Sequence, residues 1–145
     1  LGIRFPMLFG IPSEFIASAF ALSVNSGAYV AEILRSGIQS VDNGQMEASR
    51  SLGLNYWSTM RYIIIPQAIK NILPSLANEF ITLVKESSII SVIGVVEIMR
   101  TADIVKNAAF RALEPLIVAA AIYFVITFTL SRLVGLLEKK LSVSN

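Results

Sequence analysis

Two long apolar stretches dominate the pattern of hydrophobic and polar positions along the chain. Residues 15–31 and residues 116–131 contain no charged side chain. Together with their flanks, up to Leu34 and Leu137, they reach the roughly 20 residues that a helix needs to cross the hydrocarbon core of a bilayer, because each residue rises only about 1.5 Å. The pattern therefore predicts two membrane-spanning helices.

Residues 72–98 form a third stretch of sufficient length, but it carries four charged residues: Glu79, Lys85, Glu86 and Glu97. We predict this stretch to be a third span with one polar face. At 100° per residue, the polar side chains of residues 71–86 gather within an arc of about 120°, and apolar side chains occupy the rest of the helix circumference. These polar residues are Asn71, Ser75, Asn78, Glu79, Thr82, Lys85 and Glu86.

A charge in the bilayer centre costs at least ~2.5–3.5 kcal/mol, so such groups normally face a cavity, a transport path or a protein partner. We interpret the polar face as the lining of a solute path. Packing against other helices is the alternative, and the sequence does not decide between them. The candidate solute-path residues are Ser75, Asn78, Glu79, Thr82, Lys85 and Glu86. In the first span, Glu32 and Arg35 stand three residues apart, which favours a local ion pair.

The segment between the first two spans is neither a span nor a tight turn. Asp42 to Gly44 is a turn signal. Residues 45–52 are then expected to form a short helix with Glu47 near its start, where the helix dipole favours an acid. Gly53 suits the left-handed position that ends such a helix. Asn55 or Ser58 can cap the helix that follows.

The distribution of Lys and Arg predicts the orientation of the spans. Seven basic residues lie in residues 35–70 and at the C-terminal end, against three in residues 97–114. We therefore expect residues 35–70 and the C-terminus to lie in the cytoplasm.

Composition supports a membrane protein and excludes several classes of function. Only 15% of the residues are charged and the mean hydropathy is +0.68, whereas an average soluble domain is about 25% charged. No histidine or cysteine is present, which removes the commonest ligands of a metal site and the commonest catalytic groups. The basic residues form no cluster of the kind that nucleic acids require.

The residues from Glu47 to Pro66 carry a family resemblance. The letters E-A-S, three residues, G, nine residues and I-I-I-P resemble the "EAA" motif of ABC-importer permeases, with Ser49 and Ile65 as mild departures. The flanks, among them residues 37–41, 66–69, 73–78 and 83–88, are similar to the branch that takes up polar amino acids. The likeness extends over about residues 26–140.

In this family the motif forms a cytoplasmic coupling helix that docks on an ATP-hydrolysing subunit. The resemblance thus implies a coupling role for Glu47, Ala48, Ser49, Arg50, Leu52, Gly53 and Pro66. It also implies a second permease subunit, two ATP-binding subunits, an extracytoplasmic solute-binding protein and the lipid bilayer as partners. The chain lacks a Gly-x₄-Gly-Lys-Ser/Thr loop, so ATP and magnesium are expected on the partner ATPase and no cofactor on this chain.

The expected fold is all-α and integral to the membrane, that of a type I ABC-importer permease, with 1–145 as one transmembrane domain and residues 35–62 as its coupling loop. Permeases of this branch usually have about five spans, so two further spans are expected before Leu1.

Two other readings of the function are open. A channel or structural helical protein outside the ABC class would explain the spans but not the motif. A membrane-embedded enzyme would use Glu79 or Glu86 as acid–base groups, without any histidine or cysteine to assist them.

Overall fold

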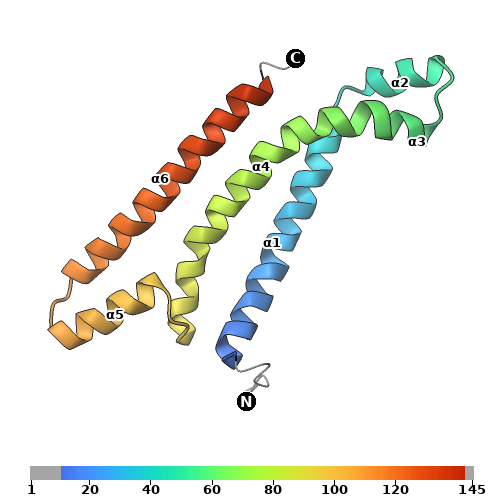
Figure 1. Cartoon of the computed structure of the whole chain (residues 1–145). Helices are drawn as coiled ribbons and strands as arrows, with labels where there is room; N and C mark the ends of the chain where they lie inside the picture. The colour runs from blue at the N-terminus through green and yellow to red at the C-terminus, as the bar shows by residue number, and fades with distance from the viewer. Residues whose placement is uncertain (1–10, 143–145) are drawn as a thin grey trace. The chain divides into compact units, whose positions relative to one another are not determined.

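The computed structural model describes the backbone of residues 11–142 and the side chains of residues 11–139. Leu1 and the side chain of Lys140, both used above, lie outside these ranges. Residues 11–142 form eight helical segments in chain order (Figure 1): α1 (Ser13–Gln39), α2 (Asn43–Ser51), α3 (Tyr56–Thr59), the π-helix η1 (Met60–Ile64), α4 (Ile65–Glu86), the 3₁₀ helix η2 (Ser87–Ile93), α5 (Ile98–Ala109) and α6 (Glu114–Ser142).

Two of the described helices are long and apolar enough to cross a membrane, which agrees with the two charge-free stretches. They are α1 and residues 114–139 of α6. At about 1.5 Å per residue, the 27 residues of α1 extend roughly 40 Å, the thickness of a bilayer with its headgroups. The helix α4 does not meet the same criterion, because its polar face lowers its apolar content.

The expectation of a span over residues 72–98 is wrong in its bounds. The helix α4 begins earlier, at Ile65, and ends at Glu86, where η2 takes over. In η2 the hydroxyls of Ser87, Ser88 and Ser91 donate to backbone carbonyls three residues before them, at 2.7 Å in each case. Gly94 then adopts a left-handed conformation with φ of +94°, which ends the helical run.

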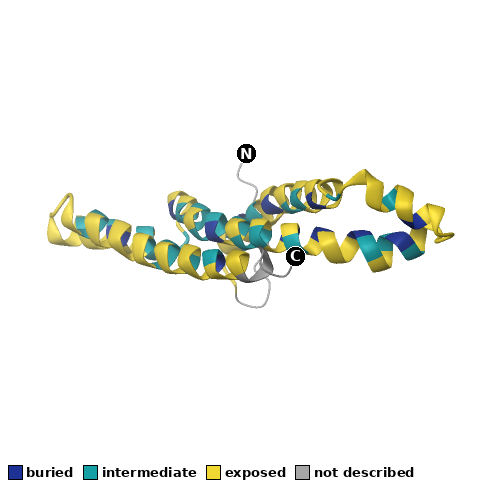
Figure 2. Cartoon of the chain, turned by 90° about the horizontal axis from the view of Figure 1, so that it is seen from above, coloured by how far each residue is buried: buried dark blue, intermediate teal, exposed yellow. Residues whose placement is uncertain are grey.

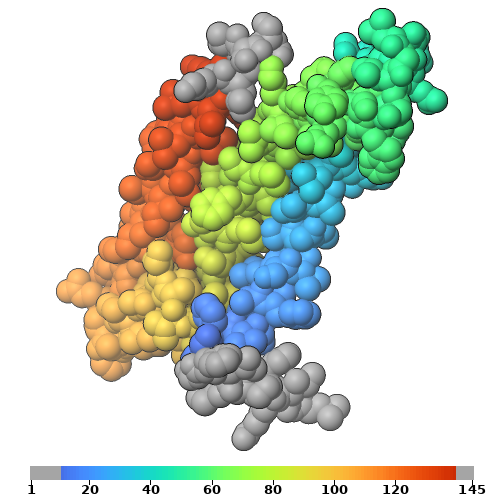
Figure 3. Space-filling view, turned by 45° about the vertical axis from the view of Figure 1, so that its right-hand side comes forward, coloured from blue at the N-terminus to red at the C-terminus, as the bar shows by residue number. Residues whose placement is uncertain are grey.

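A helix that the sequence analysis did not predict, α5, occupies the connection between the second and third spans. Its N-cap is Glu97, whose carboxylate accepts hydrogen bonds from the backbone N–H of Met99 at 2.7 Å and of Arg100 at 2.5 Å. The same carboxylate accepts the hydroxyl proton of Tyr123 in α6 at 2.6 Å. Figure 3 shows α5 lying against the first half of α6, where Ala102 and Ala119 are both buried. Glu97 is therefore an N-cap and a link between α5 and α6.

The chain divides into two compact units, each with a small core of its own. One comprises residues 1–26 and 80–131, the other residues 27–79 and 132–145. In the first unit Ser18, Ile81, Ser91, Ala102 and Ala119 are buried; in the second the buried residues include Ser49, Thr59, Ile64, Ala68, Ile72 and Val134. Small side chains recur in both lists, as expected where helices approach closely in a membrane.

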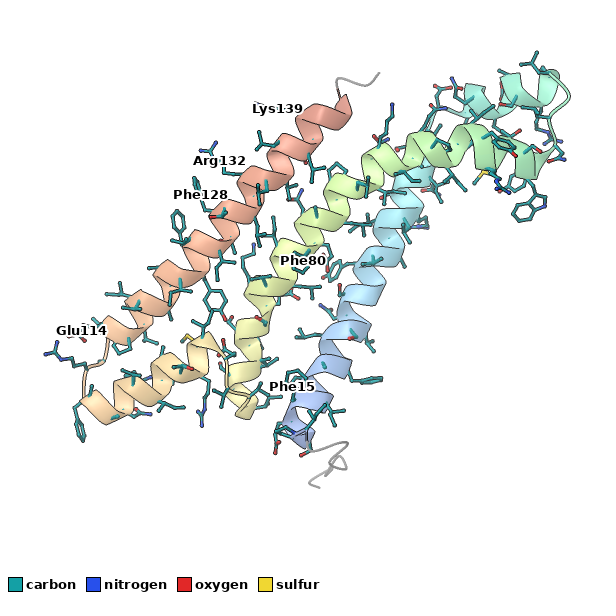
Figure 4. The ribbon with its side chains drawn as sticks, viewed as in Figure 1. Phe15, Phe80, Glu114, Phe128, Arg132 and Lys139 are labelled. Carbon is teal, nitrogen blue, oxygen red and sulfur yellow. The ribbon has the colours of Figure 1, made fainter. Side chains whose placement is uncertain are left out.

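Large apolar side chains are exposed along the helices of both units (Figure 2). Within α6, Phe124 and Phe128 stack with their ring centroids 5.7 Å apart. Phe128 points away from α5 (Figure 4). Exposed apolar surface on this scale is typical of helices that contact lipid or other protein chains.

Candidate functional site

The helix α2 is held at its first residue by a side-chain cap. Asp42 is the N-cap, and its carboxylate accepts a hydrogen bond from the backbone N–H of Gly44 at 2.6 Å. The helix therefore begins at Asn43, two residues before the predicted start, and the Asp42–Gly44 turn signal is the helix cap. Glu47 is consequently the fifth residue of α2 and lies outside its first turn, so the expected interaction with the positive end of the helix dipole is wrong.

Gly53 ends α2 in the conformation that the sequence predicts. Its φ is +85°, and its N–H donates to the carbonyl of Arg50 at 3.0 Å while the N–H of Leu54 donates to the carbonyl of Ser49 at 3.1 Å. This pair of bonds is a Schellman motif, which requires a left-handed residue after the helix. A Cβ built on Gly53 meets no atom within 4 Å, so the backbone conformation alone demands glycine here.

The residues of the coupling motif fall into an exposed set and a buried one. Glu47, Ala48 and Arg50 are exposed, and Leu52 has 84% of its surface exposed. Ser49 is only 2% exposed, and its hydroxyl donates to the carbonyl of Gln45. The exposed residues are accessible on the surface of this chain, whereas Ser49 takes part in its packing.

Pro66 lies just after an unusual stretch of helix. Asn55 caps α3 by accepting the backbone N–H of Ser58 at 2.8 Å, as the sequence allows. The helix then widens into η1, where the N–H of Ile65 donates to the carbonyl of Met60, five residues back. Pro66 has no N–H to donate and cannot continue the regular pattern of bonds four residues apart. The widened turn therefore lies directly before the residue that cannot donate a backbone hydrogen bond.

Two contacts join α4 to the end of α1 within the second unit. The amide of Asn71 donates to the hydroxyl of Ser40 at 2.8 Å. One residue further on, Ile72 packs against Gly37, which is buried. The helical wheel assigns Asn71 to the polar face of α4, whereas the role of Gly37 was not predicted. The signal that could have found it is a small residue in the last turn of a helix that spans the membrane.

The candidate solute-path residues lie on one face of α4, as the helical wheel predicts, and each unit holds three of them. In the second unit Ser75 and Asn78 are exposed and Glu79 is half-buried. In the first unit Lys85 is exposed, Thr82 and Glu86 are half-buried, and Glu86 accepts a hydrogen bond of 3.4 Å from the amide of Asn25 in α1. Part of this face therefore contacts polar groups of the chain itself, while Ser75, Asn78 and Lys85 remain accessible.

The predicted ion pair in α1 is confirmed. The guanidinium of Arg35 lies 3.0 Å from the carboxylate of Glu32, and both side chains are exposed. An exposed pair of this kind contributes at most about 1 kcal/mol. It therefore stabilises the end of α1 locally.

Comparison with known proteins identifies the family. The model of the family described as "binding-protein-dependent transport system inner membrane component" matches residues 4–143. The chain is 47% identical over 140 residues to a Rickettsia bellii protein named "Putative glutamine transport system permease protein GlnP", covering 96% of this chain and 64% of that one. It is 46% identical over 137 residues to the arginine transport system permease protein ArtQ of Bacillus subtilis, covering 94% and 63%.

A solved structure shares the fold. The crystal structure of an amino acid ABC transporter with histidines matches with a TM-score of 0.86 and 57% identity, covering 91% of this chain and 61% of that one. The chain thus spans less than two thirds of the length of these relatives. The expected all-α fold of an ABC-importer permease is confirmed, and the chain belongs to the family of inner membrane components of binding-protein-dependent transport systems.

Proposed function

We propose that the protein is the membrane subunit of an ABC transporter that imports a polar amino acid, and that it couples ATP hydrolysis by a partner subunit to movement of the solute. The observation that carries the proposal is the exposure of Glu47, Ala48 and Arg50 in α2 and of Leu52 directly after it, in a helix that is capped at both ends. The similarity to permeases named for glutamine and arginine transport supports the class of solute.

The short length of α2 supports a docking role for it. A helix of nine residues is marginal in water, because nucleation is costly and few hydrogen bonds are gained. Its caps at Asp42 and Gly53 preserve the helix, while the exposed residues offer a carboxylate, a guanidinium and an apolar side chain to a partner surface. Closure of an ATPase dimer would move α2, and the backbone would transmit this movement through α3 and η1 to α4.

The polar face of α4 is the proposed solute path. An amino acid presents an ammonium and a carboxylate, and α4 offers Glu79 and Lys85 on one face. Ser75, Asn78, Thr82 and Glu86 add groups that donate or accept hydrogen bonds. Alternating access of this face would follow the nucleotide state of the ATPase, and by reciprocity the presence of solute must change the affinity of the ATPase for nucleotide. We expect this coupling to appear as a change in the ATPase rate as well.

The complete assembly would contain a second permease subunit, two ATP-binding subunits that hold ATP and magnesium, and an external solute-binding protein. The excess of basic residues in residues 35–70 and near Arg132 and Lys139 supports a cytoplasmic position for α2 and for the C-terminus. This chain would bind no nucleotide itself and would carry out no catalysis.

The proposal is tested with the full-length permease reconstituted with its ATPase and solute-binding subunits. We expect labelled glutamine, arginine, histidine or glutamate to be taken up, with competition among the four defining the preferred solute. Glu47→Lys should abolish solute-stimulated ATP hydrolysis while the permease remains in the membrane. Glu114→Lys, a charge reversal at the exposed start of α6, is the matched control. Normal solute-stimulated hydrolysis in Glu47→Lys would contradict the coupling role of α2.

A further inference from the structure

Three aromatic side chains gather at the segment that joins α2 to α4. Tyr56, Trp57 and Tyr62 are 51%, 79% and 68% exposed. The rings of Tyr56 and Trp57 meet edge to face with centroids 5.5 Å apart. The guanidinium carbon of Arg61 lies 5.7 Å from the centroid of the Tyr62 ring. We call Tyr56, Trp57, Arg61 and Tyr62 the aromatic face.

The aromatic face is separate from the residues that pack this segment within its own unit. Thr59 and Ile64 are the buried residues of α3 and η1, and Ser49 is the buried residue of α2. The small side chains of Ser49 and Thr59 thus fill the interior, while the largest rings of the segment remain outside. Tyrosine and tryptophan with an adjacent cation are the side chains enriched where a protein meets lipid headgroups.

All the charged residues in the sequence around the aromatic face are basic. Between Glu47 and Glu79 the sequence contains Arg50, Arg61 and Lys70 and no acidic residue. Anionic lipids attract basic segments at the membrane surface, by about 1 kcal/mol for each Lys or Arg close to it. The charge therefore complements anionic lipid headgroups.

The depth of the aromatic face follows from its link to α1. The candidate span α1 ends at Gln39, and the next residue, Ser40, accepts the hydrogen bond from Asn71 of α4. Asn71 is therefore level with the end of this candidate span, which is the expected membrane boundary on this side. In Figure 1, α3 and the first turns of α4 run sideways to the turns of α4 that follow. A sideways course keeps this segment close to the boundary.

We propose that the aromatic face lies in the headgroup layer of the bilayer and contacts anionic lipids, with Arg61 facing their phosphate groups. This contact would hold the coupling loop against the membrane while the exposed residues of α2 stay available to another subunit. The inference needs only the membrane location of the family and is independent of the coupling role of α2. The alternative is that the ATPase subunit, and not lipid, covers the aromatic face. The test below distinguishes the two.

Trp57 is the one tryptophan of the 145 residues, which makes its fluorescence a probe of this face. The full-length permease is placed in nanodiscs with lipids brominated at acyl positions near the headgroup or deep in the core, with and without the ATPase subunits. Trp57→Phe supplies the background from any tryptophan elsewhere in the full-length protein. We expect Trp57 to be quenched more strongly by shallow than by deep bromines, equally with and without the ATPase.

The lipid charge is tested in the same nanodiscs. Brominated phosphatidylglycerol should quench Trp57 about two- to fivefold more strongly than brominated phosphatidylcholine, given the effect expected of one basic residue. Arg61→Gln should remove most of this preference, whereas Arg100→Gln in α5, also exposed, should leave it unchanged. The proposal is overturned if neither lipid quenches Trp57, or if quenching disappears when the ATPase subunits bind. Solute-stimulated ATP hydrolysis, measured on the same samples, reports separately on the proposed coupling.

Discussion

Gly37 of α1 leaves no room for a side chain against Ile72 of α4. A Cβ built on Gly37 would lie 2.2 Å from Cγ1 and 3.0 Å from Cδ1 of Ile72. Next to this contact the amide of Asn71 donates its hydrogen bond to Ser40. The approach of the two helices at the base of the coupling loop thus depends on the absence of one methyl group.

Gly37→Ala should therefore push α1 and α4 apart at this point. Overpacking of this kind costs about 1–3 kcal/mol, so the thermal midpoint of the purified permease should fall. Gly27→Ala in the same helix is the matched control, because a Cβ there meets no atom within 4 Å. In an Ile72→Ala background, the cost of Gly37→Ala should largely disappear. An equal cost in both backgrounds would show that the contact with Ile72 is not its cause.

Gly53→Val should impair the proposed coupling of α2 to the ATPase, because it strains the backbone at the C-terminal cap of α2. A left-handed conformation costs a residue with a side chain about 1–2 kcal/mol, and a β-branched residue more. Solute-stimulated ATP hydrolysis should fall severalfold in the reconstituted transporter. Gly53→Asn is the control, since asparagine tolerates this conformation and the added side chain has space. If both variants are equally impaired, side-chain contact rather than backbone conformation explains the requirement for glycine.

Tyr123→Phe should loosen α5 from α6. It removes the 2.6 Å bond to the carboxylate of Glu97, and hydrogen bonds to charged groups contribute about 1.5–3 kcal/mol. We expect a lower thermal midpoint and faster amide hydrogen exchange at Met99 and Arg100, whose N–H groups Glu97 caps. Tyr29→Phe, at a residue 55% exposed in α1, is the comparison. Unchanged exchange at both amides would mean that Glu97 caps α5 without help from Tyr123.

Glu79→Gln and Lys85→Met should change transport if the polar face of α4 contacts solute. Each variant removes one charge that could pair with an ammonium or a carboxylate, so we expect a roughly tenfold lower uptake or an altered preference among amino acids. Phe80→Leu, on the apolar side of the same helix, should transport normally. Uptake of unchanged rate and selectivity in both charge variants would assign the face to helix packing.

Local chemistry made several features predictable. The charge-free stretches of α1 and α6 were identified from length and apolarity, because a bilayer imposes both. The cap at Gly53 and the cap at Asn55 were predictable because each depends on one residue and on the backbone within a few residues of it. The Glu32–Arg35 pair follows in the same way from helical spacing.

The helix α5 escaped prediction because its determinants are not local. Glutamate is an uncommon N-cap, and Glu97 is positioned here by Tyr123, which lies 26 residues away in the sequence. After Glu86, α4 gives way to η2, in which serine hydroxyls bond to the backbone, and Gly94 ends η2. Apolarity alone made residues 72–98 look like one continuous span. The burial of Ser49 and the contact of Gly37 with Ile72 likewise arise only when two helices pack.

By itself the sequence indicated that this protein resides in a membrane. It also predicted the two apolar spans, the polar face of α4 and the motif that marks the family, since each follows from composition, periodicity or spacing along one segment. The tertiary structure decided which motif residues are exposed and where α4 ends, and it brought Gly37 to Ile72 and Glu97 to Tyr123. The physical reason is that burial and long-range hydrogen bonds depend on which segments meet, and no single segment contains that information.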